Sequence, residues 1–242
     1  MKERIYLTLL TALLLLSAGS FIPSRAANLS ALTPEMVVDR LTNEFMKIKD
    51  IRTDFTLETN LFLLGCGGTM RQKGYGLYKY PDNLKIVMNG ITYIFKGNQI
   101  KRIDAERKIT YWRFMNSPDF SIGYTPRLIT HNFYLQIIKA GPGEIVIEGL
   151  PKPGVLKNVN KVTFYIDPVK WLLKRLDISF QNKSLSGYAD INYDKIDGVW
   201  APIGTAGKSA FQARNNSLIG FSFRLRGQNM LINSGIPDSE FK

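Results

Sequence analysis

The chain contains one histidine and one cysteine, and these two residues limit the chemistry that it can perform. His131 lies in an apolar segment, and Cys66 precedes two glycines. A structural zinc site needs about four ligands, and a Cys-His catalytic pair needs both members side by side. Without a second thiol, a disulfide within the chain is excluded. We therefore expect no metal site, no cofactor and no thiol-based catalysis.

Two other motifs match known binding loops only in part. Asp190, Asp194 and Asp197 could belong to a calcium loop, but the EF-hand spacing and its closing glutamate are missing. The stretch 204–209 resembles the end of a phosphate-binding loop, with Pro202 where that loop requires glycine. The chain also lacks a G-x-S-x-G nucleophile elbow. The sequence thus predicts a protein that is not an enzyme and has no catalytic residues.

The first 26 residues have the pattern of a secretory signal peptide. A positively charged start precedes an apolar run over 5–16, and small residues at 24–26 resemble a cleavage site. The run is about 12 residues long, against roughly 20 needed to span a bilayer, and a retained anchor helix is the alternative. We expect cleavage, export to the periplasm and a single domain over 27–242.

The chain is strongly basic, with 32 Lys and Arg against 20 Asp and Glu and a formal net charge of +12. A basic exported protein meets anionic lipid head groups or anionic polymers, and nucleic acid is not expected as its partner. The alternative is that the cations are the polar faces of strands. The scattered cations considered are Arg71, Lys73, Lys79, Lys85, Lys101, Arg102, Arg107 and Lys108.

Hydrophobic periodicity predicts one helix followed by many strands. Thr33 and Pro34 form a helix start, and apolar residues follow at helical spacing as far as Ile48. The period then becomes two, with Phe55, Leu57, Thr59, Leu61 and Leu63 on one strand face. Further strands are predicted over 70–80, 84–88, 92–95, 99–104, 110–114, 144–148, 159–166, 171–180, 187–193, 200–203, 209–214 and 218–226. Residues 234–242 are expected to be loosely held.

A second helix is predicted over 126–139. Thr125 and Pro126 repeat the helix start, and Ala140 to Pro142 end the segment. Two helices among these antiparallel strands predict a mainly β (α+β) fold: a large curved sheet that forms an incomplete barrel covered by helices. Such a barrel can enclose an apolar cavity, over which the second helix is either a lid or a fixed plug.

The order of several short motifs resembles the LolA-like outer-membrane lipoprotein-sorting proteins. The matching segments are 45–55, 74–86, 94–99 with Asp104, 125–129, 164–167 and 173–176. The resemblance implies a periplasmic carrier that binds the acyl chains of lipoproteins, or other lipids, in a hydrophobic cavity and transfers them toward the outer membrane. It also implies an inner-membrane exporter and an outer-membrane receptor as partners, and we expect a monomer.

Alternation and resemblance together define a candidate lipid-binding cavity. Its expected lining residues are Phe55, Leu57, Leu77, Ile86, Met88, Leu128, Ile129 and Phe133. Carriers of this family have an arginine before the strand-ending proline that latches the lid. Tyr80 stands there in this chain and is expected to contact the lid through its phenol. The alternatives are a lipid- or peptide-sensing domain that regulates a membrane partner, an exported hydrolase, and a structural envelope protein.

Overall fold

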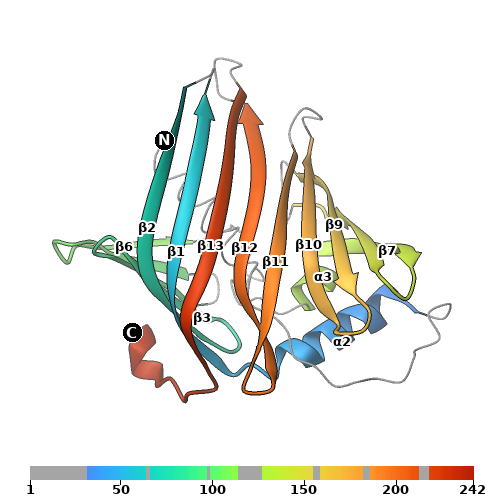
Figure 1. The fold of residues 1–242 in the computed structure, drawn as a ribbon, viewed down its shortest axis with the longest axis horizontal. Coiled ribbons are helices and arrows are strands. Elements are labelled where there is room, and N and C mark those ends of the chain that lie inside the picture. The colour runs from blue at the N-terminus through green and yellow to red at the C-terminus, as the bar shows by residue number, and fades with distance from the viewer. Residues whose placement is uncertain are drawn as a thin grey trace.

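One antiparallel sheet of 13 strands makes up most of the fold (Figure 1). The computed structural model describes residues 32–63, 66–96, 99–113, 127–154, 159–181, 186–212 and 218–242. The strands are β1 (Asp50–Leu63), β2 (Cys66–Lys79), β3 (Asn83–Met88), β4 (Ile91–Lys96), β5 (Gln99–Ile103), β6 (Ile109–Arg113), β7 (Phe133–Ala140), β8 (Ile145–Pro151), β9 (Val159–Asp167), β10 (Leu172–Phe180), β11 (Ser186–Ile196), β12 (Val199–Gln212) and β13 (Leu218–Ile232). Their order is β6-β5-β4-β3-β2-β1-β13-β12-β11-β10-β9-β8-β7.

The sheet is not closed. Within the described residues, β6 and β7 end the strand order and each pairs with a single neighbour. The strands near both ends turn away from the long central strands β1, β2, β12 and β13, so the sheet is strongly curved (Figure 1). This confirms the predicted mainly β class and the large unclosed antiparallel sheet.

Strand register divides the sheet into two faces. Phe55 of β1 lies opposite Gly74 of β2 and Gly227 of β13. Side chains two residues apart point to the same face, so the pairing of neighbouring strands carries this assignment across the sheet. We call the face that carries Phe55 the inner face and the opposite one the outer face.

The predicted first helix is confirmed as α2 (Pro34–Phe45). The Thr33 hydroxyl accepts a hydrogen bond from the Met36 N–H at 3.3 Å, and Pro34 occupies the first turn, where its missing N–H has no cost. Val37 and Leu41 are among its buried residues and pack against inner-face side chains of β8, β9 and β10. The helix therefore covers the inner face at that end of the sheet.

The predicted helix over 126–139 was wrong beyond its first turns. Helix α3 (Arg127–Asn132) has 6 residues, and β7 follows at once. Phe133, Leu135 and Ile137 are half-buried whereas Tyr134 and Ile138 are exposed, which is the alternation of a strand. Pairing with β8 satisfies the backbone hydrogen-bonding groups of this segment. Its aromatic and β-branched residues also favour a strand. Apolar residues at both spacings made the segment ambiguous in the sequence.

The two strands predicted over 200–214 are one strand, β12. Gly207, between the two predicted strands, lies beneath an aromatic ring, as Gly74 of β2 does. A Cβ atom at Gly207 would lie 2.7 Å from the Phe223 ring, and one at Gly74 would lie 2.8 Å from the Phe55 ring. Both distances are shorter than real contacts, so the absence of a Cβ atom leaves room for these rings on the inner face.

The expectation that residues 234–242 are loosely held was also wrong. The chain ends in a short 3-10 helix, η2 (Asp238–Phe241), and Ile236 and Phe241 are buried against Leu77 and Ile94 of the sheet. Lys79 pairs with Asp238, and Lys85 pairs with Glu240 at 2.7 Å. The last residues thus cover part of the outer face of β2 to β4.

Acid is expected to release this C-terminal segment. The hydrogen bond and charge of Lys79 hold the pKa of Asp238 below its usual range, and Lys85 does the same for the pKa of Glu240. Both carboxylates therefore favour docking fully above their ordinary pKa of about 4, and this contribution is lost as the pH falls through the lowered folded-state pKa values. NMR signals of the segment, followed between about pH 6 and pH 2, report the release.

A double variant, Lys79→Met with Lys85→Met, is the control for this titration. Without the two ammonium groups the carboxylate pKa values return toward their ordinary range, so any remaining transition should move to higher pH. Signals that titrate identically in both proteins would show that these ion pairs do not hold the segment.

Candidate functional site

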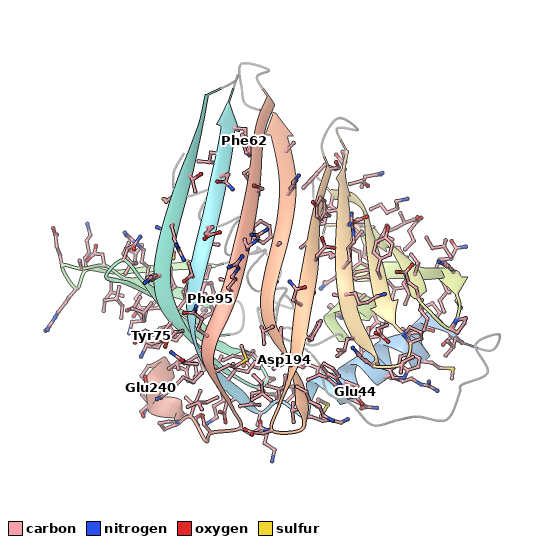
Figure 2. All side chains as sticks on the ribbon, in the orientation of Figure 1. Glu44, Phe62, Tyr75, Phe95, Asp194 and Glu240 are labelled. Atoms are coloured by element: carbon pink, nitrogen blue, oxygen red, sulfur yellow. The ribbon has the colours of Figure 1, made fainter. Side chains whose placement is uncertain are left out.

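The inner face carries an apolar cluster built from distant parts of the strand order. We call it the inner cluster; its members are Phe55, Leu57, Ile86, Met88, Phe95, Ile100, Ala189, Phe221 and Phe223. Phe95, labelled in Figure 2, comes from β4, whereas Ala189 comes from β11. These strands are far apart in the sheet, so their membership of one packed cluster requires the sheet to curl over itself.

Aromatic rings dominate the floor of the inner cluster. Phe221 and Phe223 follow each other on the inner face of β13, with ring centroids 6.3 Å apart. The ring of Phe223 rests over Gly207, and that of Phe55 rests over Gly74. Burying each large apolar side chain contributes about 1.5–3 kcal/mol, so this surface strongly favours apolar contact over water.

The structure brings together four of the residues predicted to line a cavity. Phe55, Leu57, Ile86 and Met88 are all members of the inner cluster and are buried. Their inward orientation follows from the period-two pattern of β1 and β3. Whether they contact a lipid remains a prediction.

Another predicted residue, Ile129, lies in a second cluster, which we call the helix cluster. Its members are Val37, Val38, Leu41, Ile129, Ile145, Ile147, Val162, Phe164, Ile166, Trp171, Leu173, Leu176 and Ile191. Phe133 packs against this cluster, and its ring meets that of Phe164 edge to face at 5.9 Å. Leu225 contacts both clusters, so the apolar inner face is continuous. The Leu128 side chain lies outside the described residues.

Leu77 is not part of this surface. The register places it on the outer face, opposite Lys85, and it packs against Ile236 and Phe241 of the C-terminal segment. Tyr78, its neighbour in the sequence, faces inward instead. The prediction that Leu77 faces the cavity was wrong, because the alternating aromatic and glycine residues of β2 do not show which side of the strand is apolar.

Tyr80 lies at the base of the sheet, beside α2. Its ring is 6.2 Å from that of Phe45, the last residue of the helix. It also lines a groove of about 580 Å³ together with Met46, Lys49 and Pro237. The contact made by this phenol is thus with α2, and its contact with a lid remains a prediction.

Tyr78, two residues before Tyr80, has a structural role. Its hydroxyl donates to the Pro81 carbonyl at 3.2 Å. Burial, aided by neighbouring Tyr80 and Asp82, raises the pKa of Tyr78 far above its ordinary range, so the phenol stays neutral.

Three polar side chains interrupt the apolar inner face. Thr59, Gln72 and Thr205 are buried, and the Thr59 Oγ1, Gln72 Oε1 and Thr205 Oγ1 atoms have no hydrogen-bond partner within the described residues. Gln72 and Thr205 fall in one cross-strand row, on either side of Leu57 and Leu225. The sequence did place Thr59 on the apolar face, but its isolated hydroxyl gave no functional signal by itself.

The described residues contain no group of three or more metal-ligating side chains. His131 is exposed on α3, and Asp190 pairs with Arg175 at 3.6 Å. The stretch 204–209 lies inside regular β12 rather than in a phosphate loop. Its resemblance to a nucleotide site was therefore coincidental.

The chain matches no protein-family model and no curated protein. Its similarity is to solved structures. A DUF1329 family protein from Desulfovibrio piger aligns with a TM-score of 0.62 and 15% identity, over 86% of this chain and 96% of that one. A LolA superfamily protein from Nitrosomonas europaea aligns with a TM-score of 0.60 and 12% identity, over 88% and 98%. The chain has a LolA-like fold.

A third structure supports the same assignment. It is a putative outer membrane lipoprotein-sorting protein domain from Vibrio parahaemolyticus, with a TM-score of 0.55, 12% identity and coverage of 80% and 89%. These values establish a shared LolA-like architecture, as the sequence motifs had predicted. In the part of the chain that the structure describes, no helix has the length and apolar character to cross a membrane.

Proposed function

We propose that the protein is a periplasmic carrier that binds the acyl chains of lipoproteins, or of other lipids, and transfers them toward the outer membrane. The observation that carries the proposal is the continuous apolar inner face of an unclosed, curled sheet with a LolA-like fold. In this role the protein is not an enzyme, needs no cofactor and acts as a monomer between an exporter and a receptor.

The inner cluster supplies the contact surface for a chain. Each methylene transferred from water to such a surface contributes about 0.8 kcal/mol, so a chain of ordinary length gains enough to bind. The cluster joins β4 and β5 to β11 and β13 through side chains rather than through strand pairing. An acyl chain can therefore enter by separating these side chains. Within the described residues β6 and β7 are the edges of the sheet, so the sheet can widen without losing backbone hydrogen bonds.

The polar atoms on the inner face favour a cargo with ester or amide groups. A buried hydroxyl without a partner costs about 1–3 kcal/mol. Thr59 Oγ1 and Thr205 Oγ1 can donate to an ester or amide carbonyl, which is the group that joins acyl chains to lipoproteins and phospholipids. In the same proposal, α3 with Leu128, Ile129 and Phe133 acts as the lid.

Native mass spectrometry of protein purified without detergent tests the proposal. We expect a bound acylated molecule that organic extraction releases intact, and saturable uptake of a fluorescent fatty acid by the emptied protein. Protein denatured before the assay is the control for nonspecific partition. A bare mass with no uptake would contradict a carrier, and release of hydrolysed product from an ester probe would contradict a role without catalysis.

A further inference from the structure

The outer face of the four central strands is strongly basic. Its exposed cations include Arg71 and Lys73 of β2, Arg224 and Arg226 of β13, and Lys208 of β12. They occupy adjacent cross-strand rows, since Arg226 and Lys73 flank Thr56, and Arg224 and Arg71 flank Glu58. The arrangement covers a patch about 14 Å wide across four strands.

The described carboxylates neutralise this patch in part, through Glu58. Elsewhere on the described surface, cations such as Lys85, Lys161 and Arg175 are paired with carboxylates. Within the patch, Glu58 lies 3.6 Å from Arg71. Among the described residues, no ion pair joins Lys73, Lys208, Arg224 or Arg226 to a carboxylate. Four positive charges on one sheet face therefore remain available to a partner.

An apolar side chain lies at the end of the same face. Phe62 of β1 is on the outer face, next to Gly67 and Gly220, and is 56% exposed. Figure 2 shows it near the upper tip of the sheet, and no described helix lies over this part of the strands in Figure 1. The register places it beyond the rows that hold the cations. Basic residues beside an exposed aromatic ring are typical of surfaces that bind anionic bilayers.

We propose that the outer face of β2, β1, β13 and β12 docks on the surface of an anionic lipid bilayer. The face is broad and open, with cations distributed in rows, as a plane of head groups requires. Phe62 reaches the acyl boundary while the cations contact phosphate. The bilayer would then meet the side of the sheet opposite the apolar inner face, so docking and cargo binding use separate surfaces.

Vesicle flotation with the whole chain tests this proposal. We expect binding at low salt to vesicles of phosphatidylcholine with phosphatidylglycerol, loss of binding in about 0.5 M NaCl, and little binding to phosphatidylcholine alone. Binding to the phosphatidylcholine vesicles also measures any contribution of the apolar N-terminal stretch to membrane binding. Arg224→Glu with Arg226→Glu should weaken binding to the anionic vesicles at least about tenfold.

The matched control reverses two exposed cations elsewhere, Arg107→Glu with Lys108→Glu, in the turn between β5 and β6. This control should keep its binding, and both variants should keep the wild-type Tm and fatty-acid uptake. Equal losses in the two variants would overturn the proposal, because net charge alone would then explain the attraction. Binding to heparin without binding to the anionic vesicles would overturn it in favour of an anionic polymer.

Discussion

Replacing Ala189 with phenylalanine is expected to weaken fatty-acid binding at least about tenfold, a loss of about 1.4 kcal/mol. Ala189 is a small, buried member of the inner cluster on β11, and it lies opposite Gly207 and Leu176. The space over Gly207 already holds the Phe223 ring. A second ring at Ala189 fills the volume that an acyl chain must occupy when it separates the cluster.

The reason for the large effect is close packing. Protein interiors leave few voids larger than a water molecule, so an added ring and an acyl chain cannot share this position. The substitution has a cost in overpacking of about 1–3 kcal/mol, which thermal unfolding measures separately. Binding is then measured by fluorescence titration at a temperature where the variant is fully folded.

Ala206→Phe provides the matched control. Ala206 precedes Gly207, the residue of β12 that lies opposite Ala189. The register places Ala206 on the outer face, between Asp190 and Arg224. The same added ring there should leave fatty-acid affinity within about twofold, because it points away from the inner cluster. Equal affinity for wild type and Ala189→Phe would exclude the inner cluster as the binding surface.

The inner face was largely predictable because strand alternation is a local property. Phe55 and Leu57 were assigned to one face from spacing alone, and pairing then placed them beside Ile86 and Met88. Leu77 shows the limit of such reasoning. A one-residue change in register moves a side chain to the other face, and the glycines of β2 do not define which side is apolar.

Long-range packing could not be predicted from the sequence in the same way. Residues 133–140 have apolar side chains at both helical and strand spacing, and the partner strand β8 decided the outcome. The polar C-terminal residues were expected to be loosely held, but Ile236 and Phe241 pack against apolar side chains of β2 and β4. In both cases the deciding contact is with a segment that local periodicity does not identify.

Replacing Asp50 with alanine is expected to lower the free energy of unfolding by about 2–4 kcal/mol and to release the C-terminal segment. Asp50 is the first residue of β1 and is 4% exposed. Its carboxylate accepts hydrogen bonds from the Ser234 N–H at 2.8 Å, the Ser234 hydroxyl at 3.0 Å and the Gly235 N–H at 3.0 Å. Denaturant titration measures the stability, and amide hydrogen exchange measures the release of residues 233–242.

Asp54→Ala is the control that removes a carboxylate from the same strand without removing the contacts of Asp50 with the C-terminal segment. Asp54 is on the same strand and the same outer face, but it is exposed, and within the described residues its carboxylate accepts one side-chain hydrogen bond, from Asn229 at 2.9 Å. Its replacement should cost less than about 0.5 kcal/mol and leave exchange near the C-terminus unchanged. Similar losses in the two variants would show that Asp50 does not anchor the segment.

The Asp50 variant also tests whether the two faces of the sheet act independently. The C-terminal segment covers Leu77 and Ile94 on the outer face, whereas the inner cluster lies on the other side of the same strands. Side chains on the two faces of a sheet point in opposite directions from the strands. Release of the segment should therefore leave the inner cluster packed and the fatty-acid affinity of the folded protein unchanged. A loss as large as that in Ala189→Phe would instead mean that the C-terminal segment controls how far the sheet can open, and the carrier would then need both faces to hold its cargo.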